Sequence, residues 1–201
     1  MIRLVLASAS VCCSVSMGGA VVIGDKQDDL VFSAFRSACL SARIPSEAKR
    51  QAIIDGWRPA DERQHPFLVA AMNGTYDLGD SGEESISSFG EVYRKDVEGR
   101  TMFLAVSSST GPVNLLGCFL YDLEAAVPMP PSLLREWIGE DPPEVISIPK
   151  SVEVQNWYQP VSLRGIWSVR YGFIAADSSA VAETGFSGQW LGIVSLAEGG
   201  H

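Results

Sequence analysis

The stretch from residue 101 to residue 121 reads TMFLAVSSSTGPVNLLGCFLY and holds two apolar runs separated by a short polar segment. The runs Thr101–Val106 and Val113–Tyr121 have the apolar, β-capable composition that is typical of strands. Ser107–Pro112 predicts a loop between them, because serine, glycine and proline are typical turn residues. Consecutive strands joined by a short loop usually pair, so we expect two antiparallel neighbours in one sheet.

The rest of the C-terminal half continues this pattern. Further strands are expected at residues 91–93, 152–158, 165–175 and 188–196. One short helix, Ser132–Ile138, is expected between them, because Pro128–Pro131 introduces it and Gly139 ends it. Residues 58–65 and 177–187 predict loops, whereas the apolar run 66–72 fits a strand or a helix equally well.

The N-terminal part of the chain has helical periodicity instead. Over Asp28–Ala42 one apolar stripe is formed by Leu30, Val31, Phe35, Ala38 and Cys39. Ile44-Pro45 breaks this helix, and Ser46 is the expected N-cap of a second helix, Glu47–Gly56. Trp57 is expected to fold back into the core. Helices followed by strands predict an α+β protein, with an N-terminal helical hairpin packed on a mainly antiparallel β-sheet.

The first residues predict export. Arg3 precedes an uncharged run from Leu4 to Gly24, which is the layout of a secretory signal peptide. Gly18-Gly19-Ala20 supplies small residues, so we expect residues 1–20 to be the signal peptide and residues 25–201 to form a single α+β domain. An uncleaved anchor reaching to about residue 24 gives the same topology, with the domain secreted or periplasmic. A buried element of a cytosolic protein is the alternative.

Four cysteines are present, and two of them, Cys12 and Cys13, lie in the leader. Cys39 and Cys118 would remain after processing, and two cysteines in an oxidising compartment predict one disulfide. It would join the first helix to the sheet. Two separate buried thiols are the alternative.

The charge balance limits the possible partners. The formal net charge is −9, and the basic residues are scattered, so nucleic-acid binding and attachment to an anionic membrane beyond the leader are not expected. A partner steered by charge would be cationic. The oligomeric state is left open.

Specific catalytic signatures are missing from the sequence, and no cofactor is expected. A histidine mechanism would depend on His65, because the other histidine, His201, is the last residue. His65 follows Asp61 and Glu62, which could orient its ring, and a nucleophile could come from Ser107–Ser109. A secreted hydrolase using His65 is therefore one hypothesis, and a solvated loop histidine is the alternative.

The acidic segment DLGDSGEE at residues 77–84 is the candidate metal site. Asp77, Asp80 and Glu83 supply hard oxygen ligands of the kind that calcium prefers. Their spacing does not match an EF-hand, so a solvated acidic turn is the simpler interpretation, and we expect no bound metal.

Aromatic residues gather late in the chain, and Trp157 and Tyr158 are the candidate binding residues. Amides flank the two rings in Asn156-Trp157-Tyr158-Gln159, a composition that suits sugar stacking or a protein interface. Trp167 and Trp190 lie within expected strands and are assigned to the core.

These observations favour a non-catalytic extracytoplasmic protein that binds another macromolecule, as an inhibitor or an accessory factor. The alternatives are the hydrolase using His65 and a carbohydrate-binding module using Trp157 and Tyr158. The sequence does not identify the partner.

Overall fold

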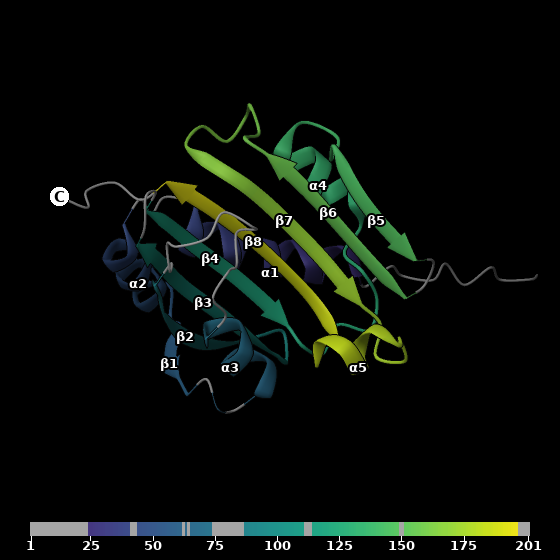
Figure 1. Cartoon of the computed structure of the whole chain (residues 1–201), viewed down its shortest axis with the longest axis horizontal. Helices are drawn as coiled ribbons and strands as arrows, with labels where there is room; N and C mark the ends of the chain where they lie inside the picture. The colour runs from purple at the N-terminus through teal and green to yellow at the C-terminus, as the bar shows by residue number, and fades with distance from the viewer. Residues whose placement is uncertain are drawn as a thin grey trace, which may run out of the picture.

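The computed structural model describes residues 24–40, 44–61, 63, 65–73, 87–110, 114–148 and 151–196 (Figure 1). Two N-terminal helices that contact each other pack with an antiparallel sheet of eight described strands. The fold is therefore α+β, with a helical hairpin on an antiparallel sheet, as the sequence predicts. The expected signal peptide lies outside the described residues.

Every strand pair in the sheet is antiparallel, and the spatial order is β1-β2-β3-β4-β8-β7-β6-β5. The strands are β1 Arg58–Ala60, β2 Ser87–Val97, β3 Arg100–Thr110, β4 Leu115–Asp122, β5 Glu144–Ile148, β6 Val152–Tyr158, β7 Ile166–Ile174 and β8 Gly188–Leu196. Strand β8 thus inserts between β4 and β7, so the last of the described strands joins the two halves of the sheet.

Helices cover both faces of the sheet. The back face carries α1 (Gly24–Cys39), α2 (Pro45–Ile54) and α4 (Pro131–Ile138), whose buried side chains share one core cluster with the sheet. The front face carries α3 (Pro66–Asn73) and α5 (Ala180–Thr184), which pack over a second cluster. Figure 1 shows α1 running behind the strands while α3 and α5 lie at the lower end of the sheet.

Burial on both faces of β3 explains why residues 102–106 form a continuous apolar run and not an alternating one. Met102, Leu104 and Val106 belong to the back cluster, and Phe103 and Ala105 belong to the front cluster. Neighbouring side chains in a strand point to opposite faces, so a strand covered on both sides must be apolar at every position.

A disulfide joins Cys39 at the end of α1 to Cys118 in β4, with the two Cα atoms 5.7 Å apart. The predicted pairing is confirmed. Both cysteines are buried, because Cys39 lies on the apolar stripe of α1 and Cys118 points to the back face of the sheet.

Three loops expected from the sequence contain strand or helix residues. Ser107–Thr110 extends β3, because its backbone pairs with β2 on one side and with β4 on the other. In the polar segment 58–65, Arg58–Ala60 pairs with β2 as β1. In the segment 177–187, Ala180–Thr184 forms α5. Of the three, β1 depends on a partner distant in the sequence, β2, which composition does not reveal.

The remaining differences concern the start of one helix, the type of one undecided run and one further strand. Helix α2 was expected to begin at Glu47 with Ser46 as its N-cap. It begins at Pro45 with Ile44 as its N-cap, because the fixed φ of proline suits the first helical position. The undecided run 66–72 is helical, as α3. Strand β5, Glu144–Ile148, was not predicted. Gly139 ends α4 in the left-handed conformation, as expected.

We expect replacement of both Cys39 and Cys118 by alanine to lower the free energy of unfolding by about 2–4 kcal/mol. The disulfide closes a long loop, and its loss restores conformational entropy to the unfolded chain. Urea unfolding of the oxidised protein, the reduced protein and the variant measures the effect. Reductant should weaken the native protein but leave the variant unchanged; equal unfolding midpoints for all three would contradict the prediction.

Candidate functional site

The loop between β6 and β7, residues 159–165, is held in place by hydrogen bonds at several points. The amide of Val161 donates to Glu140 Oε1 at 3.3 Å, and the hydroxyl of Ser162 donates to the carbonyl of Ile138 at the end of α4. The amide of Leu163 donates to the carbonyl of Pro160 at 3.1 Å. The loop is therefore fixed to α4 and to the segment that follows it.

A β-bulge turns Trp167 out of the core. Ile166 pairs with Ser195 and Ser168 with Val194, so Trp167 is the extra residue on β7. Its carbonyl accepts a hydrogen bond from the amide of Gln159 at 2.8 Å. Bulges redirect side chains and are common next to functional sites. The indole is 47% exposed, so its assignment to the core was wrong.

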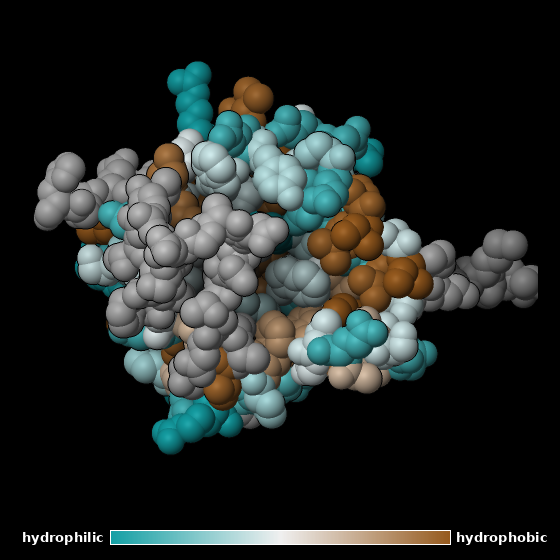
Figure 2. All heavy atoms as spheres, viewed as in Figure 1, coloured by the Kyte–Doolittle hydropathy of each residue, from teal (hydrophilic) through white to brown (hydrophobic). Residues whose placement is uncertain are grey.

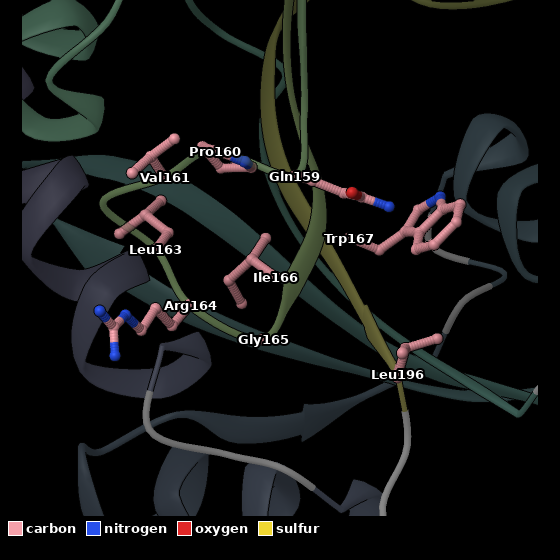
Figure 3. Close-up of a pocket in the computed structure, with 9 residues that line it drawn as sticks. All are labelled: Gln159, Pro160, Val161, Leu163, Arg164, Gly165, Ile166, Trp167 and Leu196. Carbon is pink, nitrogen blue, oxygen red and sulfur yellow. The ribbon is translucent and has the colours of Figure 1, made fainter.

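This loop, the bulge and the end of β8 surround a shallow hollow of about 350 Å³, which we call the β6–β7 hollow (Figure 3). It is lined by Gln159, Pro160, Val161, Leu163, Arg164, Gly165, Ile166, Trp167 and Leu196. Val161 is 83% exposed and Leu196 is 47% exposed, so apolar groups are open to solvent here. Figure 3 shows Gln159 and Trp167 pointing to the same side of β7, away from Val161.

The chemistry of the lining favours binding. Most of the lining side chains are apolar, and the polar ones are the Gln159 amide and the Arg164 guanidinium. No hydroxyl, thiol, imidazole or carboxylate side chain is among the lining residues. The hollow can thus hold an apolar group of a partner, but its described lining offers no nucleophile or general base.

Tyr158 lies beside the hollow in a polar cluster on the front face. Glu144 Oε2 accepts hydrogen bonds from Asn156 Nδ2 at 2.7 Å and from the Tyr158 hydroxyl at 2.9 Å. The Asn156 bond, followed by the Tyr158 bond, lowers the pKa of Glu144, and the carboxylate in turn raises the pKa of Tyr158. These bonds tie β5 to β6.

The two predicted binding residues, Trp157 and Tyr158, have opposite environments. Trp157 is 1% exposed in the back core, where its Nε1 donates to the carbonyl of Glu140 at 3.1 Å. Tyr158 is 53% exposed on the front face. Adjacent residues of a strand point to opposite faces, so the structure does not present the two rings side by side as a sugar-stacking platform.

His65 has a local structural role at the start of α3. Its Nδ1 accepts a hydrogen bond from the amide of Phe67 at 3.2 Å. Asp61, which was expected to orient it, is paired with Arg63 through an O···N distance of 2.9 Å. The proposed nucleophiles Ser107–Ser109 belong to β3 rather than to a loop. Among the described residues, His65 thus contacts the backbone of α3, and Asp61 pairs with Arg63.

The candidate metal ligands Asp77, Asp80 and Glu83 lie outside the described residues, as does His201. Among the residues that the structure does describe, no group of three or more His, Cys, Asp or Glu side chains could hold a metal ion. None of the described helices is both long and apolar enough to span a bilayer.

A buried polar network lies deeper in the protein, between β3, β4 and β8. Asp122, 1% exposed, accepts hydrogen bonds from Arg100 Nη1 at 2.5 Å and from Gln189 Nε2 at 3.3 Å. Burial raises the pKa of Asp122 more than the nearby Arg100 cation lowers it. The adjoining cavity of about 10 Å³ holds at most about one water molecule. That cavity is too small for a substrate, and the hydrogen bonds of Asp122 link β4 to β3 and β8.

Comparisons with protein families, curated proteins and solved structures find no match to this chain. The functional inference therefore rests on the geometry described above.

Single substitutions of Trp157 and Tyr158 by alanine should differ in their effect on stability, because the first residue is buried and the second is exposed. We expect Trp157→Ala to lower the free energy of unfolding by about 3–5 kcal/mol, because it empties a buried site. Tyr158→Ala should change it by less than about 1 kcal/mol, because its hydrogen bond is exposed. Thermal or urea unfolding measures both, and equal losses would contradict this placement of the rings.

Tyr158→Phe should raise the pKa of Glu144 toward its ordinary value, because the carboxylate loses one of its two donors. The native pKa is depressed, so the interaction contributes at neutral pH and is lost as the pH falls through that pKa. Carboxyl NMR titration of both proteins measures the shift. Tyr93→Phe, which removes the hydroxyl that donates to Glu91 on β2, is the control. An unshifted Glu144 in Tyr158→Phe would disprove the contact.

Proposed function

We propose that this protein is a non-catalytic extracytoplasmic factor that binds another protein through the β6–β7 hollow. The observation that carries the proposal is the lining of the hollow, which combines exposed apolar side chains with no proton-transferring side chain among the lining residues. Interfaces are centred on such apolar groups, with tryptophan and arginine prominent among the residues that contribute most.

The rigid loop supports this proposal energetically. Binding is weakened when flexible segments must be ordered, and each immobilised side chain costs roughly 0.5–1.5 kcal/mol. Here the hydrogen bonds of Val161, Ser162 and Leu163 already fix the loop, and the bulge already exposes Trp167. A partner therefore meets a surface that is formed before binding.

The disulfide and the net charge indicate the compartment of the protein and the charge of its partner. A disulfide is typical of extracytoplasmic proteins, and the leader-like N-terminal sequence agrees with export. The net charge of −9 would speed association with a cationic partner. An inhibitor or an accessory factor of a secreted or envelope system fits both properties.

Site-specific photo-cross-linking in the exporting host tests the proposal. A photoreactive residue at Val161 should give one discrete adduct, because this side chain lies at the hollow and is 83% exposed. The matched control is Ile54 on α2, which is apolar and 62% exposed but distant in the fold. Trp167→Ala should abolish the adduct without changing the melting temperature.

Two outcomes would refute the proposal. Equal cross-linking from Val161 and Ile54 would mean that the hollow is not selective. Turnover of an ester or amide substrate that His65→Ala abolishes, with the fold intact, would replace the binding function by the hydrolase. On the proposal, His65→Ala leaves both the cross-link and the melting temperature unchanged.

A further inference from the structure

The two edges of the described sheet differ in how they are protected. Strand β1 is three residues long and contains Pro59 between Arg58 and Ala60. Short length, charge and proline are common means of preventing an edge from pairing with another chain. Strand β5 at the opposite edge, with the sequence EVISI, is longer than β1, contains no proline and carries its one charge at its first residue, Glu144.

Strand β5 is exposed on both faces. All five of its residues are exposed, and Val145, Ile146 and Ile148 are each between 52% and 55% exposed. Ile146 and Ile148 pair with Val154 and Val152 of β6, so the four side chains form an apolar band on the front face. Figure 2 shows brown, hydrophobic atoms gathered at the side of the molecule where Figure 1 places β5.

We propose that β5 pairs with β5 of a second copy of this chain, antiparallel and with Ile146 at the two-fold axis. In this register Ile146 faces Ile146 of the other copy, Val145 faces Ser147, and Glu144 faces Ile148. The two sheets become continuous, and the apolar band of one copy extends into that of the other. This surface is separate from the β6–β7 hollow, and the proposal does not rest on the proposed function.

The charges of the strand permit this pairing. Glu144 is the only charged residue in β5, and in the two-fold register the two Glu144 residues lie four positions apart along the strands. That separation is about 14 Å at 3.4 Å per residue, which exceeds the screening length of about 8 Å at physiological ionic strength. Like charges therefore do not face each other, although each copy is strongly acidic overall.

The register also decides against other pairings of the same edges. A shift by one residue would turn the apolar Ile146 and Ile148 away from the matching face of the second copy. A five-residue strand is a small interface, so the dimer should be weak and depend on concentration.

Disulfide trapping tests the register directly. Opposite residues of antiparallel strands have Cα atoms about 4.5–5.5 Å apart, within the range of about 4.4–6.8 Å that a disulfide needs. Ile146→Cys should therefore link two copies under oxidation, in a background where Cys12 and Cys13 are serine. The single variants Val145→Cys and Ser147→Cys are the matched controls and should link much less, because neither residue faces its own counterpart. The double variant Val145→Cys/Ser147→Cys should link well, because these two positions face each other in the proposed register.

Sedimentation velocity of the purified protein, from low micromolar to submillimolar concentration, tests the association itself. The native protein should shift toward dimer as its concentration rises. Ile146→Lys should remain monomeric, because it places two ammonium groups opposite each other, and Val161→Lys at the hollow should still dimerise. A native protein that stays monomeric, or an Ile146→Lys variant that dimerises normally, would overturn the proposal. Equal linking by all three single-cysteine variants would also overturn it. If β5 instead pairs with an extended segment of another protein, the purified native protein should stay monomeric, which is the first of the contradicting results.

Discussion

Residues 102–106 of β3 are all buried, so along this stretch neither face of the strand reaches the solvent. Such a strand is stable only if other elements cover both of its faces. Helices α1 and α2 provide that cover at the back and α3 at the front, and the disulfide from Cys39 to Cys118 fixes α1 to the adjacent strand β4. The architecture follows from this double burial.

Cover decreases across the sheet from β3 toward β5. Strand β4, next to β3, is largely buried, whereas every residue of β5 is exposed. The β6–β7 hollow and the apolar edge both lie in this less covered half. Glu144 and Tyr158 connect the two regions, because their hydrogen bond ties the edge strand to the strand that leads into the hollow. A partner protein and a second copy would thus use different parts of one end of the molecule.

Close contacts on the front face also depend on glycine. A Cβ atom at Gly192 would lie 2.1 Å from Cδ1 of Phe119, and one at Gly172 would lie 2.0 Å from the Trp190 ring. In each case an aromatic ring lies against a glycine on the neighbouring strand. Trp190 therefore packs onto the sheet, while Trp167, freed by the bulge, faces the solvent.

The sequence by itself determined the α+β class, the N-terminal helices, strands β6 and β8 to the residue, and the disulfide. Local periodicity and strand propensity carry this information, and the disulfide needed only two cysteines in buried stretches. The sequence also predicted a binding surface around Tyr158. It wrongly predicted that Trp157 is exposed on that surface and that Trp167 lies in the core. Alternation along β7 puts Trp167 in line with the buried Val169 and Tyr171, and only the bulge against β8 breaks that line. Tertiary structure alone decided β1 and the hollow, because β1 pairs with the distant strand β2 and the hollow forms where the end of β8 meets the β6–β7 loop. Strand β5 pairs with β6, its neighbour in the chain, but its position at an open edge follows only from the strand order of the whole sheet.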